Sequence, residues 1–273
     1  MTASGTSLSR VLVFVWTLAV LMFLCAPIVV ILPISLSAGP FLSYPLPGLS
    51  LRWFRLITEP FPWVFALKNS LIVGSCATAL AVSLGTLAAY GLTSGRFRGR
   101  QLVMVMLLSP MVVPVVISGL GLYFFLSRTG LLGSFTGLIV AHTVLGIPFV
   151  VATVGATLQG FDRNLARAAQ SLGGHPVRAF LDVTLPIIMP GVVSGAIFAF
   201  VTSFDEVVVA LFVSSPSTLT LPRQLFSGLR DQVTPALVAV ATVLIFVSIA
   251  LMATIEALRR RSERIMPSGR EAA

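Results

Sequence analysis

Two adjacent acidic residues, Asp205 and Glu206, are the best candidates for chemistry in this 273-residue chain, because both lie inside an apolar run. A charged side chain at the centre of a bilayer costs roughly 2.5 to 3.5 kcal/mol on insertion scales, so such carboxylates usually face a bundle interior, a water-filled cavity or a cationic partner. Two interpretations stay open. Either the pair offers a negative site to a cationic solute, or it accepts hydrogen bonds from helix ends or pairs with Lys68 or Arg223.

The sequence lacks the patterns that support catalysis. No glycine-rich phosphate loop precedes the single lysine, Lys68, so this chain has no motif for ATP hydrolysis. If its function uses ATP, the hydrolysis is expected on another polypeptide. An intramembrane hydrolase would need His142 to act as a base for Ser109 or Ser118, and no glycine-flanked serine signature supports this. We expect His142 to bond a neighbouring carbonyl and not a metal ion, because the only other histidine, His175, lies on a distant connection. We predict no catalytic residue, no metal site and no cofactor bound by this chain.

The elements that position these residues are predicted to be membrane-spanning helices. The chain is 56% hydrophobic and only 10% charged, whereas an ordinary soluble domain has about 25% charged residues. A hydrocarbon core about 30 Å thick requires roughly 20 apolar residues per helix. Six runs reach that length: Val11 to Leu36, Ala66 to Leu92, Leu102 to Leu126, Phe135 to Leu158, Ile187 to Val213 and Thr234 to Leu258. These features predict an all-α integral membrane protein with a single transmembrane domain over residues 1–273.

The distribution of basic residues predicts the orientation of these helices. Connections on the side of the two termini carry twelve arginines, and those on the opposite side carry six basic residues. Because basic residues are retained on the cytoplasmic face, both termini are predicted to be cytoplasmic. The net charge of +9 is then explained by topology and by contact with lipid headgroups. Nucleic-acid binding is not expected, because no basic soluble domain is present.

Two prolines, Pro110 and Pro114, lie four residues apart in the third run. Proline removes a backbone hydrogen bond, so the helix is expected to kink there. A kink that faces a cavity would line a translocation pathway, and kinked packing without pathway contact is the alternative. The pathway candidates are therefore Ser203, Phe204, Asp205, Glu206, Pro110 and Pro114.

The connection 159–186 is the only long polar segment between two spanning runs. Asp162 is predicted to cap a helix from Arg163 to Leu172, which Gly173 ends in the left-handed conformation. Pro176 suits the first position of a second helix, which runs to the start of the fifth span.

This second helix has two faces. Arg178 and Asp182 are spaced to pair at i, i+4 on one face, and Phe180 is predicted to be an exposed aromatic anchor on another. Pro186 is expected to end the connection and to begin the fifth span. The segment either docks into a groove of another protein or lies flat on the lipid, and the residues alone leave both possibilities open.

The connection has Ala168 and Ala169, then Gly173 four residues later, then Val183, Leu185 and Pro186. This pattern resembles the EAA loop of permease subunits in binding-protein-dependent ABC importers. In that family the loop forms coupling helices that insert into a groove of the cytoplasmic ATPase. The resemblance implies that role for Ala168, Ala169, Gly173, Leu185 and Pro186, to which we add Phe180. Arg167 stands where the family has a glutamate, so a salt bridge made by that glutamate does not carry over.

Three further segments look like the polyamine-type branch of these permeases: Asn69 to Leu71, Ser203 to Pro216 and Thr220 to Pro222. The resemblance implies the type I ABC importer permease fold, a bacterial inner-membrane location, and half of a pathway for a small cationic solute such as spermidine or putrescine. An opine or an amino-acid-like solute is the alternative.

The same resemblance implies the partners. They are an ABC ATPase dimer that binds ATP and Mg, a solute-binding protein, and a second permease, either different from this chain or a second copy of it. An ion-coupled secondary transporter is the rival class of protein. It would show an inverted repeat, but the chain has no second copy of the acidic pair or of the proline pattern.

Overall fold

The structure is a computed structural model that describes residues 5–57, 63–95, 97–231 and 234–249. Within these ranges the regular elements are helices, together with one isolated β-bridge between Ser37 and Leu49. The described residues divide into two compact units. One contains residues 5–57, 227–231 and 234–249, and the other contains residues 63–95 and 97–226.

The first unit contains α1 (Gly5–Ser35), α2 (Arg52–Ile57) and a helix over Pro235–Ile249. Ser9–Ser35 is strongly apolar on average, and none of its most apolar window is buried within the chain. Such a helix is suited to lipid on all sides. The indole N–H of Trp53 on α2 donates to the Ser37 carbonyl at 2.9 Å, which ties α2 to the segment that follows α1.

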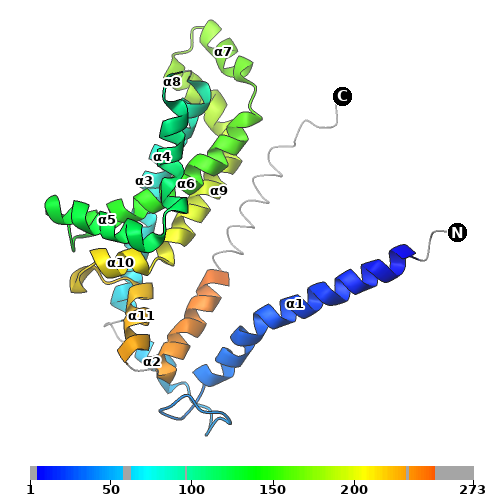
Figure 1. The fold of residues 1–273 in the computed structure, drawn as a ribbon, viewed down its shortest axis with the longest axis vertical. Coiled ribbons are helices and arrows are strands. Elements are labelled where there is room, and N and C mark those ends of the chain that lie inside the picture. Colours follow the sequence, from blue (N-terminus) through cyan, green and yellow to red (C-terminus); the bar gives the residue numbers. More distant parts are fainter. Residues whose placement is uncertain (1–4, 58–62, 96, 232–233, 250–273) are drawn as a thin grey trace. The chain divides into compact units, whose positions relative to one another are not determined.

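The second unit is built on α3 (Phe65–Ser94), α6 (Phe135–Gln159) and α9 (Leu185–Phe204), which pack side by side (Figure 1). Small residues allow this close approach, as in other helix pairs within membranes. A Cβ atom on Gly146 would lie 3.2 Å from the Cβ atoms of both Ala81 and Ala199, so this glycine brings the three helices together.

Two helical segments cover the two ends of this three-helix core (Figure 1). At one end lie α7 (Arg163–Ser171) and α8 (Pro176–Ala179), and α8 continues through a π-helical turn, Phe180–Thr184, into α9. Toward the other end α5 (Val115–Arg128) packs against α10 (Val208–Val213).

The predicted third run is a broken helix. It forms α4 (Arg100–Val112) and α5, which meet at an angle of 110°. The break falls at Val113 and Pro114, both with extended ψ angles, whereas Pro110 lies within α4. The proline pair therefore produces a change of direction much larger than a kink, and it does so at the second proline.

Four helices in the described residues are long and apolar enough to cross a membrane: Ser9–Ser35, Phe65–Ser94, Phe135–Gln159 and Pro176–Phe204. The bent α4–α5 pair makes a fifth candidate. The described part of the last predicted run is the shorter helix Pro235–Ile249, and residues 250–258 of that run lie outside the described residues. An all-helical membrane protein is confirmed, and the count of six spans stays a prediction.

Candidate functional site

The acidic pair lies in a break between two helices. The predicted run Ile187 to Val213 is not one helix, because α9 ends at Phe204 and α10 begins at Val208. Asp205 closes α9, with its backbone N–H donating to the Val201 carbonyl at 3.0 Å. The acidic pair therefore lies between two helices and not within one continuous span.

Glu206 has a structural partner at this break. Its Oε1 atom accepts a hydrogen bond of 2.8 Å from the backbone N–H of Val209 in the first turn of α10. The first N–H groups of a helix have no partner within the helix, so this carboxylate satisfies one of them. Of the two interpretations of the acidic pair, the structure gives the helix-end role to Glu206.

Asp205 has no such partner. Its side chain is exposed, and it makes no hydrogen bond or ion pair with the residues that the structure describes. Neither predicted cation pairs with the acids in these ranges: Lys68 is exposed, and the guanidinium of Arg223 donates to the Ser214 hydroxyl. Asp205 is thus the carboxylate of the pair that is available to an external cation.

A buried hydrogen bond precedes the break. Nδ1 of His142 on α6 and the hydroxyl of Ser203 on α9 are 2.7 Å apart, and both residues are buried. The partner of His142 is therefore this hydroxyl, not the expected carbonyl, and neither Ser109 nor Ser118 bonds it. Phe204 is also buried and stacks on Phe200 with ring centroids 5.7 Å apart, so its side chain belongs to the core.

The break at Pro114 and the break at the acidic pair begin two helices that pack together. Pro114 is exposed and precedes α5, and α5 contacts α10. Gly119 permits this contact, because a Cβ atom there would lie 2.8 Å from the ring of Phe212. Irregular backbone at membrane depth is tolerated where it is buried in protein or lines a water-filled cavity.

Three segments that are far apart in the sequence are joined beside α10. The amide of Asn69 on α3 donates to the Leu219 carbonyl at 3.0 Å, and the hydroxyl of Ser70 accepts from the Leu221 N–H at 2.8 Å. The hydroxyl of Ser215 donates to the Gly133 carbonyl at 2.7 Å. The side chains of Asn69 and Ser70 thus bond the backbone that follows α10, and Ser215 bonds the turn before α6. Sequence reasoning missed this role because no local pattern reveals it.

The connection 159–186 folds locally as predicted. Asp162 accepts from the Asn164 N–H at 2.9 Å and caps α7. Gly173 has a φ of +90°, and Pro176 opens α8 after His175. Arg178 and Asp182 form an ion pair, with 3.8 Å between Nε and Oδ2.

The outer surface of this connection differs from the prediction. Phe180 is only half-exposed and packs on Tyr90 of α3, with ring centroids 4.8 Å apart, so it is not the exposed anchor. The helix continues from α8 through the π-helical turn into α9 without stopping at Pro186. The exposed large apolar side chains of the connection are Leu165, Leu172, Val177 and Leu181, with exposed fractions of 47%, 90%, 60% and 50%.

The structure places the other predicted coupling residues as follows. Arg167 and Ala168 are exposed on α7, and Ala169 is half-buried. Leu185 and Pro186 are half-buried in α9, where Leu185 packs against the three-helix core. The exposed part of the predicted coupling surface therefore lies on α7 and on the turn after it.

Two broken apolar helices, an exposed carboxylate at one of the breaks and an amphipathic connection at the opposite end of the core are typical of a membrane transport component. Residues 81–264 match the family of binding-protein-dependent transport system inner membrane components, and this chain belongs to that family. It is thus the membrane component of an ABC importer, located in the inner membrane, and not the ATPase.

Curated relatives and solved structures agree with this assignment. The chain is 33% identical over 264 residues to the putrescine transport system permease protein PotI of Escherichia coli (strain K12), covering 90% of this chain and 94% of the relative. It is 32% identical to the spermidine/putrescine transport system permease protein PotC of Haemophilus influenzae, over 88% of this chain and 93% of the relative.

The fold matches a chain of a bacterial ABC transporter that imports the acidic polysaccharide alginate. The TM-score is 0.75 at 13% identity, over 94% of this chain and 98% of the other. A second structure of a bacterial alginate transporter, in complex with a periplasmic protein that carries an alginate pentasaccharide, matches with a TM-score of 0.68 at 16% identity, over 96% and 95% of the two chains. The chain therefore has the fold of an ABC importer permease.

Proposed function

We propose that this permease forms half of the pathway for a small organic polycation of the putrescine or spermidine type, and that Asp205 contacts the substrate. The observation that carries this proposal is the exposed carboxylate of Asp205, which lacks a partner among the described residues and lies at a helix break. An unpaired charge at membrane depth is costly, so a site that keeps one usually serves a charged ligand. The relatives PotI and PotC are putrescine and spermidine/putrescine permeases, which favours the same substrate class.

The proposed coupling surface lies on α7, on the turn after it and on the start of the following helix. Its candidate residues are Arg167, Ala168, Ala169, Gly173 and the exposed Leu172, and Leu185 and Pro186 support them from within α9. An ATPase dimer binds ATP and Mg, and its closure pulls on this surface. Small residues with an exposed leucine suit a groove on another protein.

The proposed assembly contains six spans per permease and both termini in the cytoplasm. A second permease, different from this chain or a second copy, completes the pathway. A solute-binding protein delivers the substrate from the outer side. The alginate transporter, in its complex with a loaded periplasmic protein, is an example of such an assembly. Alternating access then moves the cation past Asp205.

Replacement of Asp205 by asparagine tests the substrate contact. Putrescine uptake by the complete transporter in proteoliposomes is expected to fall about tenfold, the equivalent of about 1.4 kcal/mol. Binding of the ATPase is expected to stay intact. Asp162→Asn is the matched control, because asparagine caps a helix as well as aspartate does.

Two results would contradict the proposal. Normal uptake by Asp205→Asn removes the substrate contact. Competition by an excess of a zwitterionic amino acid, with none by spermidine, assigns the transporter to the alternative solute class.

A further inference from the structure

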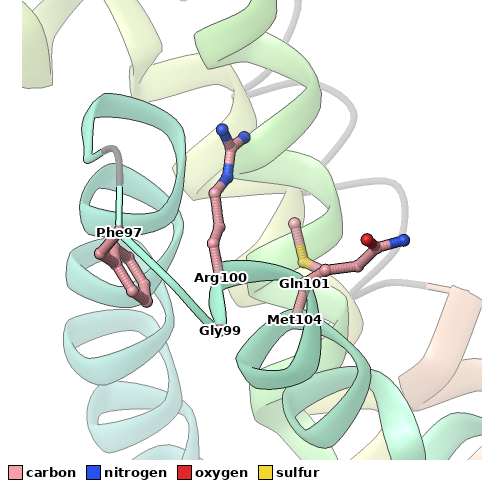
Figure 2. A pocket seen from close by; sticks show the side chains of 5 residues that line it. All are labelled: Phe97, Gly99, Arg100, Gln101 and Met104. Carbon is pink, nitrogen blue, oxygen red and sulfur yellow. The ribbon is translucent and has the colours of Figure 1, made fainter.

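An open cavity of about 530 Å³ lies at the corner between α3 and α4. This corner is at the end of the three-helix core that also carries α7 (Figure 1). The cavity is lined by Phe97, Gly99, Arg100, Gln101 and Met104 (Figure 2). Neither the proposed substrate contact nor the proposed coupling surface uses these residues.

One side of the cavity is cationic. Arg100 is the first residue of α4, and Arg98 precedes it in the turn. Both side chains are exposed, and neither makes a hydrogen bond or an ion pair within the described parts of the chain. Gly99 has a φ of +89°, a conformation that glycine adopts without strain, and it forms the turn between the two arginines.

Among the described residues, no carboxylate forms an ion pair with Arg98 or Arg100. No aspartate or glutamate occurs between Glu59 and Asp162. Asp162 uses Oδ1 to cap α7, and its neighbour Arg163 adds a further cation to this end, with Nη2 donating to the Thr93 carbonyl at 2.6 Å. The corner is therefore electrostatically suited to an external anion.

The other side of the cavity is apolar. Phe97 is 49% exposed, and Met104 lies one helical turn after Arg100. The neighbouring side chains of α4 are exposed and apolar, as lipid-facing residues are: Leu102, Val105 and Met106. Because α3 is long enough to span the membrane and ends at Ser94, the corner lies where headgroups meet acyl chains.

We propose that this cavity binds an anionic phospholipid through the phosphate of its headgroup. The guanidinium groups of Arg100 and Arg98 donate to the phosphate oxygens, for which their planar geometry is suited. Phe97 and Met104 contact the upper part of the acyl chains. Basic pockets at helix ends recognise anionic headgroups on this principle.

Native mass spectrometry of the full-length permease tests the proposal. The protein is released from micelles that contain equal amounts of phosphatidylglycerol and phosphatidylcholine. The wild type is expected to retain phosphatidylglycerol selectively, and Arg100→Gln is expected to retain about fivefold less. Arg128→Gln, which removes the same charge from an exposed site at the end of α5, is the matched control and is expected to behave as the wild type.

Arg98→Gln is a second variant with the same expected direction, and circular dichroism establishes that each variant is folded. The proposal is overturned if both lipids are retained equally, or if Arg128→Gln loses as much phosphatidylglycerol as Arg100→Gln. Displacement of the lipid by an equal concentration of glycerol phosphate would instead define a site for free phosphate. Loss of the lipid when the ATPase binds would define the corner as a protein interface.

Discussion

At the scale of single residues, two neighbouring carboxylates have different environments because they lie in the break between two helices. The helix α9 ends just before them, and α10 begins just after them. Glu206 bonds the first turn of α10, and Asp205 stays exposed after the last turn of α9. On a continuous helix both side chains would compete for the same apolar surroundings. The break therefore separates a structural acid from one that is free for a substrate.

The bond between His142 and Ser203 leads to a prediction about stability. Ser203→Ala removes the partner of Nδ1, and Nε2 of this buried imidazole already lacks a partner in the described structure. A buried polar group without a partner costs about 1 to 3 kcal/mol, so the variant is expected to unfold more easily by about that amount. Unfolding of the purified chain in detergent, followed by circular dichroism, measures the effect.

Ser83→Ala is the control for this experiment. The Ser83 hydroxyl is exposed and donates only to the Ala79 carbonyl in its own helix, so its loss is expected to change stability by less than about 0.5 kcal/mol. Equal stability of the two variants would show that the His142–Ser203 bond contributes nothing.

Residue-level features were predictable where they depend on near neighbours in the chain. The Asp162 cap, the left-handed Gly173 and the Arg178–Asp182 pair follow from spacings of four residues or fewer. The His142–Ser203 bond joins residues 61 positions apart, and the Asn69 bonds span about 150 positions. Tertiary packing brings these partners together, that of α6 on α9 in the first case and that of α3 on the segment after α10 in the second, so no local pattern could reveal them.

At the scale of elements, the sequence predicted where helices start better than how they continue. Apolar runs located α3 and α6 closely, because their whole length is apolar. The third and fifth runs are also apolar, yet each is broken, since hydropathy does not detect a 110° turn at Pro114 or a glutamate that caps a new helix. In the connection, the helix continues through a π-helical turn, and this decides which side chain faces outward.

The outward face of the connection gives a prediction at this scale. Leu172 is 90% exposed, whereas Phe180 packs on Tyr90. Leu172→Asp is therefore expected to weaken binding of the ATPase about tenfold, because a charge would enter an apolar groove, and to leave the stability of the permease unchanged. Affinity of the purified permease for the ATPase, measured by surface plasmon resonance, checks this.

Phe180→Leu is the comparison variant. It is expected to lower the stability of the permease by about 1 kcal/mol, because the ring contact with Tyr90 is lost, and to leave ATPase affinity within twofold. The reverse pattern, with affinity sensitive at Phe180 and insensitive at Leu172, would restore Phe180 as the anchor.

At the scale of the whole molecule, the proposed topology places the two ends of the three-helix core on opposite sides of the membrane. Leu172 follows α7 at one end, and Arg128 ends α5 toward the other. The excess of arginine in connections on the side of α7 predicts that this side is cytoplasmic.

Single cysteines test this topology in right-side-out membrane vesicles. Cys25 and Cys76 are both exposed and are first replaced by alanine. A membrane-impermeant maleimide is then expected to label Arg128→Cys in intact vesicles, and Leu172→Cys only after permeabilisation. Labelling of Leu172→Cys alone in intact vesicles would invert the topology and place α7 out of reach of a cytoplasmic ATPase. Labelling of both in intact vesicles would mean that the core of α3, α6 and α9 does not separate its two ends across the bilayer.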